Sequence, residues 1–121
     1  MTVNIGVIII FQDRIMKTLR LSVLDRLMLP QLLPQTGGKL EMLIVNSIVN
    51  TIEFTAQDRS DFGLKEDNGN VSWASGGEAD FEFTPEQVEV LKNAARRADD
   101  EKKVTRQNLW LIEKIDALVS G

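Results

Sequence analysis

The chain has 121 residues, of which 43% are hydrophobic and 26% are charged. This balance is typical of one globular domain and argues against a chain that is disordered throughout. The formal net charge of −4 at pH 7 disfavours general affinity for nucleic acid or for an anionic membrane, because neutralisation of phosphates supplies most of that affinity.

Three residue types are absent: cysteine, histidine and tyrosine. Without cysteine there is neither a disulfide framework nor a thiolate metal site. Without histidine the chain lacks the usual general base and the commonest metal ligand. We therefore expect a protein that is not an enzyme and that uses no cofactor and no metal.

The N-terminal residues 1–15 contain an apolar, β-branched run, Val3–Phe11, which predicts a strand. The run is too short to span a membrane, and it lacks the basic flank and cleavage site of a signal peptide. A cytoplasmic location is the default expectation. Met16 would also serve as a start, so residues 1–15 are either a genuine strand or an upstream extension.

The next stretch, KTLRLS from Lys17, alternates leucine with polar residues and predicts a short strand. Ser22 then caps a predicted helix that begins at Val23. Pro30 lies inside its apolar pattern and removes one backbone donor, so we expect a kink or a stop near Leu29.

Lys39–Asn50, after a loop at Gln35–Gly38, predicts a helix with a wide apolar face. Its apolar side chains form two neighbouring stripes: Leu40, Leu43, Ile44, Ile48 and Ile52, and Met42, Val45 and Val49. A helix of this kind is either central to the core or part of a subunit contact, and both alternatives stay open.

Two similar stretches, EFTAQ and EFTPE, each predict a strand end followed by a helix start. Thr55 and Thr84 are the expected capping residues, and Asp58 and Gln87 are their polar partners three positions later. The first helix is short, whereas the second continues to about Lys102. This repeated pattern favours a capping role for both threonines over a role as nucleophiles.

The segment between these helices predicts strands near Gly63–Glu66 and Asn70–Ala74, joined by a type I′ turn at Asn68-Gly69. A third strand, Ala79–Phe83, completes a predicted three-stranded antiparallel meander. Thr105 caps a last predicted helix. We therefore expect a single α+β domain, a small meander packed with four to five helices, with a helical C-terminus.

Two charged clusters are candidate sites. Glu78, Asp80 and Glu82 share one face of the predicted strand, where they either bind a hard cation or form a solvated face that protects the sheet edge. The solvated face is the simpler interpretation.

The densest basic set consists of Arg96, Arg97, Lys102, Lys103 and Arg106. Its arginines suit phosphate oxygens, although Asp99, Asp100 and Glu101 interrupt it and a solvated helix end is the alternative. Trp110 lies off the apolar stripe of the last helix, so its exposure would indicate an interface. Arg96, Arg97, Arg106 and Trp110 are the candidate ligand-binding residues.

From about Met16 onward, the stretches VLDRLMLPQLLPQTGG and RQNLWLIEKID resemble a group of small uncharacterised proteins encoded by bacteriophages and prophages. The matching positions are Leu24–Pro34, Gly37, Trp73, Phe83-Thr84 and Thr105–Lys114. The resemblance implies a setting, a phage accessory protein, rather than an activity.

Together these features favour a non-enzymatic binding or assembly module, homo-oligomeric and phage-encoded. The first alternative is a phage antidefence protein that sequesters a nucleotide signal through Arg96, Arg97 and Arg106. The second alternative is a component of the virion or of its assembly. The expected partners are a second copy of the chain, a host protein or a nucleotide-like small molecule.

Overall fold

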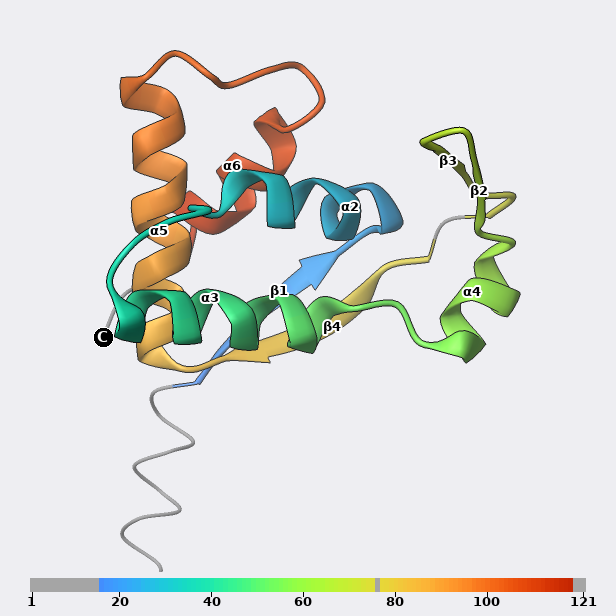
Figure 1. The fold of residues 1–121 in the computed structure, drawn as a ribbon, viewed down its shortest axis with the longest axis horizontal. Coiled ribbons are helices and arrows are strands. Elements are labelled where there is room, and N and C mark those ends of the chain that lie inside the picture. Colours follow the sequence, from blue (N-terminus) through green and yellow to red (C-terminus); the bar gives the residue numbers. More distant parts are fainter. Residues whose placement is uncertain (1–15, 76, 119–121) are drawn as a thin grey trace, which may run out of the picture.

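The computed structural model describes residues 16–75 and 77–118, and this part of the chain has an α+β fold with a helical C-terminal region, as predicted (Figure 1). The predicted strand at Val3–Phe11 lies outside the described residues. In chain order the elements are β1 (Lys17–Leu21), α2 (Val23–Leu32), α3 (Lys39–Ile52), α4 (Ala56–Phe62), β2 (Lys65–Asp67), β3 (Asn70–Ser72), β4 (Ala79–Phe83), α5 (Pro85–Asp100) and α6 (Leu109–Asp116).

The first and last strands, β1 and β4, pair antiparallel, although some sixty residues separate them along the chain. Leu19 and Leu21 are buried on one face of this pair together with Phe83. On the other face Arg20 lies opposite Asp80, and Arg20 Nη1 is 3.2 Å from Asp80 Oδ1. The acidic side of β4 is therefore a solvated face partly neutralised by its neighbour strand.

The hairpin β2–β3 forms a separate two-stranded sheet, so the predicted three-stranded meander is wrong. Its turn is as predicted: Asn68 and Gly69 have φ angles of 52° and 81°, the positive values that a type I′ turn requires. Every residue of both strands is exposed. Because the hairpin has no apolar face to bury, β4 pairs instead with β1, whose leucines complete the face that packs on the helices.

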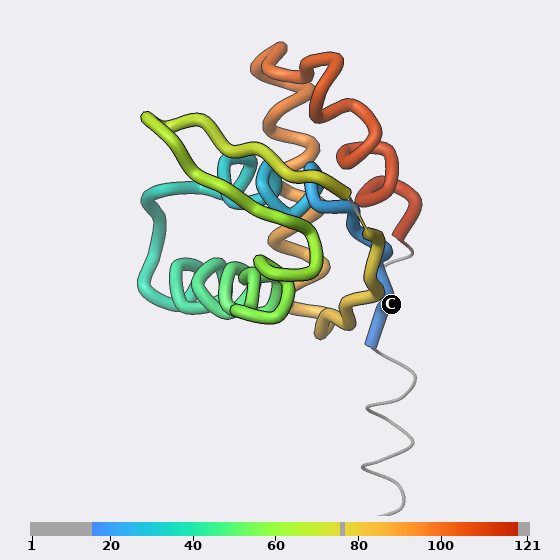
Figure 2. The backbone as a smooth tube through the Cα atoms, turned by 90° about the vertical axis from the view of Figure 1, so that its right-hand side faces the viewer, coloured from blue at the N-terminus to red at the C-terminus, as the bar shows by residue number. Residues whose placement is uncertain are grey.

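The core lies between the β1–β4 sheet and helices α2, α3, α5 and α6, while α4 and the hairpin stand at one end of the molecule (Figures 1 and 2). Helix α5 runs across the ends of α2 and α3 in Figure 1. The largest fully buried side chains are Leu21, Val23, Leu29, Ile48, Ile52, Phe83, Val88, Leu91, Leu111 and Ile115. Neither α4 nor the hairpin contributes a buried residue.

Helix α2 continues past Pro30 to Leu32, so of the two predicted outcomes near Leu29, a kink or a stop, the stop is wrong. The backbone N–H of Leu33 still donates to the carbonyl of Leu29, at 3.2 Å. Leu33 is buried, and its packing holds the last turn in place despite the donor that proline removes.

Within the described residues, four segments begin with the same reciprocal pair of hydrogen bonds, the capping box. A Ser or Thr side chain accepts from the backbone N–H three residues on, and the side chain at that third position accepts from the Ser or Thr N–H. The pairs are Ser22–Asp25, Thr55–Asp58, Thr84–Gln87 and Thr105–Asn108. The capping roles predicted for Thr55 and Thr84 are confirmed. Helix α6 itself begins at Leu109, after a turn that Thr105 closes.

The third-position residue in three of these boxes also bonds to a distant element. The Asp25 carboxylate accepts a hydrogen bond from Lys114 Nζ of α6 at 2.6 Å. The Asp58 carboxylate accepts one from Arg26 Nη2 of α2 at 2.9 Å. The Gln87 side chain donates to the hydroxyl of Ser47 in α3 at 3.0 Å. Each local cap therefore also fixes where its helix sits against the rest of the fold.

Arg26 makes the most extensive of these contacts, and its residue is only 4% exposed. Its guanidinium donates to the carbonyls of Ile52 and Glu53, both at 3.0 Å, and to Asp58. It also lies 4.1 Å from the ring centroid of Phe54. A cation here satisfies the last carbonyls of α3 and opposes the negative end of that helix dipole.

We expect Arg26→Met to lower the free energy of unfolding by roughly 3 kcal/mol, because it removes the guanidinium donor from two carbonyls and the cation that pairs with the Asp58 carboxylate. Arg26→Lys should recover only part of that loss, since an ammonium cannot reproduce the planar fork or the stacking on Phe54. Urea denaturation measures both. Arg20→Met, which removes two exposed ion pairs, to Glu78 and Asp80, is the matched control. An Arg26→Lys variant as stable as the wild type would contradict this role.

Replacing Thr55 or Thr84 by alanine should each cost roughly 1 kcal/mol of stability, because each hydroxyl is the acceptor half of a capping box. Thermal unfolding followed by circular dichroism measures the loss. Thr36→Ala, in the exposed loop before α3, is the control and should be neutral. Equal melting temperatures for all three variants would show that the caps add nothing to stability.

Candidate functional site

The residues predicted to bind a ligand are not gathered in one place. Arg97 lines a cavity beside the C-terminal end of α5, whereas Arg96, Arg106 and Trp110 do not line it. The side chain of Arg96 hydrogen-bonds to Asn93 on its own helix. Trp110 is 69% exposed on α6. The helical rotation of about 100° per residue explains why adjacent arginines diverge.

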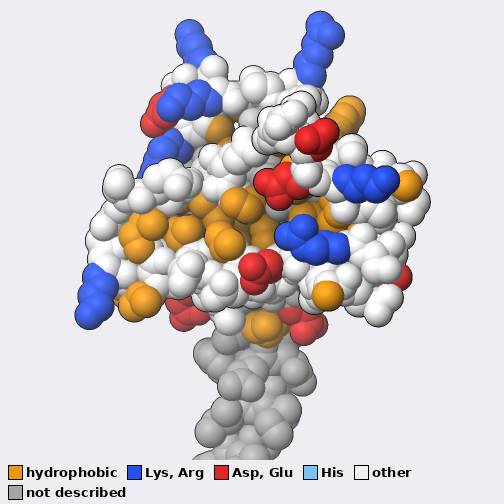
Figure 3. Space-filling model, turned by 45° about the vertical axis from the view of Figure 1, so that its right-hand side comes forward, with side chains coloured by type: hydrophobic (Ala, Val, Ile, Leu, Met, Phe, Trp, Pro, Cys, Tyr) orange, Lys and Arg blue, Asp and Glu red, His pale blue; other side chains and the backbone are white. Residues whose placement is uncertain are grey.

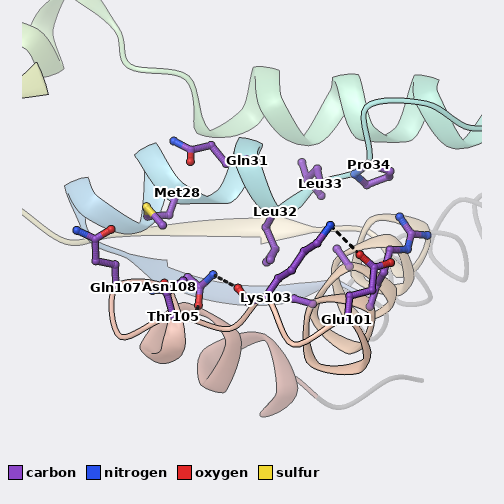
Figure 4. Close-up of a pocket in the computed structure, with 13 residues that line it drawn as sticks. Met28, Gln31, Leu32, Leu33, Pro34, Glu101, Lys103, Thr105, Gln107 and Asn108 are labelled. Atoms are coloured by element: carbon purple, nitrogen blue, oxygen red, sulfur yellow. Dashed lines mark hydrogen bonds and ion pairs between the residues drawn. The ribbon is translucent and has the colours of Figure 1, made fainter. Parts of the chain in front are cut away.

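The cavity beside Arg97 has a volume of about 450 Å³ and lies between the second half of α2, the end of α5 and the segment leading to α6 (Figure 4). Met28, Leu32 and Ala98 supply an apolar wall. Polar side chains surround that wall. Its volume lies within the range of small-molecule pockets.

The end of α5 is shaped by a left-handed residue, Lys102, with a φ of 58°. The backbone N–H of Lys103 then donates to the carbonyl of Ala98 at 2.7 Å, and the N–H of Lys102 donates to Asp99. This closing pattern ends the helix without a glycine. It turns Lys103 back toward the cavity, where Nζ lies 2.9 Å from Glu101 Oε1 (Figure 4).

Amide side chains lie at the other end of the same cavity, where Figure 4 shows Gln107 and Asn108 beside Met28, with Gln31 above. The amide of Asn108 is engaged locally, by the N–H of Thr105 and the carbonyl of Lys103. Gln107 makes no side-chain hydrogen bond within the described ranges 16–75 and 77–118. Its donors and acceptor are therefore available to a ligand.

A second concavity of about 560 Å³ lies between the end of α2 and helix α3. It is lined mainly by apolar side chains, among them Pro30, Pro34, Met42 and Val49. Figure 3 shows apolar side chains gathering across the middle of this face. We call this concavity the α2–α3 groove.

Helix α3 presents two exposed leucines beside the α2–α3 groove: Leu40 is 72% exposed and Leu43 is 57% exposed. The buried side of the same helix carries Val45, Ile48 and Ile52. Of the two alternatives for this helix, core or subunit contact, the burial pattern shows a core face and leaves an apolar face uncovered.

The exposed face of α3 also lacks charge. Both charged residues of the helix, Lys39 and Glu41, lie in its first turn, and the positions from Met42 to Ile52 are all uncharged. Asn46 and Asn50 occupy exposed positions where a surface helix commonly carries Lys or Glu. Depletion of charge with retention of apolar side chains distinguishes the centre of a protein interface from ordinary surface.

Among the described residues, two titratable groups have perturbed pKa values, and in both cases a structural contact contributes to the shift. The backbone N–H of Thr55 and then the guanidinium of Arg26 lower the pKa of Asp58 below its ordinary value. Burial alone would lower the pKa of Lys114, but its hydrogen bond to Asp25 and the charges of Asp25 and Glu78 raise it above its ordinary value. Both groups hold elements together.

The described residues contain no cluster of three or more acidic side chains placed to hold a metal ion. In the same ranges, every helix is either too short or too polar to cross a membrane. Comparison of the chain with protein-family models, with curated proteins and with solved structures gave no match.

Because folding lowers the pKa of Asp58, the free energy of unfolding depends on pH. Because its folded pKa is depressed, its contribution is present above the unfolded value near 4 and is lost as pH falls through the folded pKa. We expect Asp58→Asn to be less stable than the wild type at pH 7 by roughly 1–2 kcal/mol, and the difference to shrink as the pH falls below about 4.

Urea denaturation between pH 3 and pH 7 measures this dependence. Asp67→Asn, in the exposed hairpin, is the control and should follow the wild type at every pH. A stability difference between Asp58→Asn and the wild type that is the same at both ends of the range would contradict the assignment.

Proposed function

We propose that this protein is a non-enzymatic assembly module that binds a second copy of itself through the exposed face of α3 and the α2–α3 groove. The observation that carries the proposal is the pairing of two exposed leucines, Leu40 and Leu43, with an apolar groove on a helix that carries no charge from Met42 to Ile52. An isologous dimer requires such a surface, because each copy must supply both the protrusion and the hollow.

The charges at the two ends of α3 favour a second copy as the occupant. Lys39 lies seven residues before Asn46 and Glu53 lies seven residues after it, and both are exposed. If two copies of α3 pack antiparallel about Asn46, Lys39 of each copy faces Glu53 of the other. The two symmetric ion pairs would frame an uncharged centre.

The helix dipole adds to this argument. Within its own helix Lys39 stands at the positive N-terminal end and Glu53 follows the negative C-terminal end, and both placements are unfavourable. In the antiparallel pair each charge lies beside the opposite end of the partner helix. Charges that weaken the isolated helix would therefore stabilise the dimer.

The non-enzymatic part of the proposal is supported by the composition, which offers neither histidine nor cysteine as base or nucleophile. A role as a phage accessory protein is proposed on the sequence resemblance alone. The genes beside the coding sequence would test it: structural or antidefence phage genes support the role, and a chromosomal metabolic operon contradicts it.

Multi-angle light scattering tests self-association. We expect the wild type to have the mass of a dimer at high concentration and Leu43→Glu to have the mass of a monomer, since the substitution places a carboxylate in the apolar contact. Val71→Glu, at an exposed apolar position of the distant hairpin, should leave the dimer intact. A monomeric wild type at every concentration would refute the proposal.

A charge swap tests the antiparallel geometry. Lys39→Glu and Glu53→Lys should each weaken the dimer about tenfold, because each creates two like-charge contacts across the two-fold axis. The double variant should restore it. Each single substitution should also make the monomer slightly more stable. It places a charge beside the end of its own helix dipole that favours it, an acidic residue at the N-terminus or a basic residue at the C-terminus. Two additive losses without restoration would contradict the pairing.

A further inference from the structure

The cavity beside Arg97 shares one lining residue, Pro34, with the α2–α3 groove, and its other lining residues do not line that groove. Its uncharged polar side chains and its charged side chains lie at opposite ends. Uncharged amides, Gln31 and Gln107, lie at one end, and charged side chains, Lys103 and Glu101, lie at the other (Figure 4). The apolar wall that includes Leu32 lies between them. A ligand that fills this cavity must carry a charged group at one end, an apolar surface in the middle and uncharged hydrogen-bonding groups at the other end.

The charged end is suited to an anion. Arg97 stands one helical turn before Glu101 on α5, and it makes no ion pair with any residue that the structure describes. Lys103 is paired with Glu101, but both side chains are largely exposed, and exposed pairs of this kind add little stability. A phosphate could therefore replace Glu101 as the partner of Lys103 and bind Arg97 at the same time, through charge-assisted hydrogen bonds.

The surrounding charge supports the same conclusion. Residues 96–106 carry five basic and three acidic side chains in a chain whose net charge is −4. Lys and Arg side chains gather at the top of the molecule in Figure 3, where α5 ends. A local excess of positive charge on an acidic protein raises the local concentration of small anions there.

The amide end is suited to an uncharged ring with mixed donors and acceptors. Gln31 has one side-chain partner, the carbonyl of Leu27 on its own helix at a long 3.5 Å, and Gln107 has none among the described residues. Each glutamine offers both a donor and an acceptor. Met28 and Leu32 beside them provide the apolar contact that a flat heterocycle needs.

We propose that the cavity between α2, the end of α5 and the segment leading to α6 binds a nucleoside monophosphate. The phosphate lies on Arg97 and Lys103, and the base lies against Met28 and Leu32 with its edge toward Gln31 and Gln107. Arg96, Arg106 and Trp110, which do not line the cavity, make no direct contact with the ligand.

NMR titration of the ¹⁵N-labelled protein with the common ribonucleoside 5′-monophosphates tests the proposal. At least one should give saturable shifts in the side-chain amides of Gln31 and Gln107 and in the backbone of residues 97–108. Adenosine or the matching nucleoside should bind more weakly, and inorganic phosphate should leave the glutamine amides unmoved. Equal binding of inorganic phosphate would reduce the site to a simple anion contact and overturn the proposal.

Paired variants locate the phosphate. Arg97→Ala should weaken binding about tenfold or more, whereas Arg96→Ala, the adjacent exposed arginine, should change it less than twofold. Glu101→Gln should tighten binding, because it removes the carboxylate that competes for Lys103. Absence of saturable shifts with every nucleotide, or equal losses in the Arg96 and Arg97 variants, would refute the site. Unchanged melting temperatures exclude misfolding as the cause of a loss.

Discussion

The buried guanidinium of Arg26 is the contact on which the arrangement of the helices depends. It joins α2 to the last carbonyls of α3 and to the first turn of α4, with the Phe54 ring against its face. A buried cation is costly unless every donor is used, so the positions of these elements are coupled to one another. An apolar side chain at this position could fill the space, but it could not specify where α3 must end.

The capping boxes extend the same principle over the rest of the molecule. A cap is normally a local device that satisfies the first free N–H groups of a helix. Here Asp25, Asp58 and Gln87 each use a remaining acceptor or donor to bind a second element. The polar contacts at the helix starts therefore also orient the helices. The apolar core fills the space between them and contributes less to their orientation.

Features that depend on neighbouring residues were predictable from the sequence, and those that depend on distant pairing were not. The caps at Thr55 and Thr84, the Asn68-Gly69 turn and the alternation of β4 are local patterns. The pairing of β4 with β1 is not, because nothing local excludes a meander with β3. The role of Arg26 was missed, although a lone cation three residues before the buried Leu29 on an apolar stripe was a usable signal. Of the four predicted site residues, Arg97 lines the cavity between α2 and α5, and Arg96, Arg106 and Trp110 do not line it. Spacing along a sequence does not reveal which side of a helix faces a hollow.

The exposed hairpin and α4 have a consequence for the evolution and engineering of the chain. Asp58 and Ala79 are held by the fold, but the described residues between them add no buried side chain, and the segment forms a loop closed at both ends. Because the entropy of closing such a loop rises only slowly with its length, residues inserted at Asn68-Gly69 would cost a fraction of a kcal/mol. This tip can therefore accept a label or vary freely in length while the helices keep their positions.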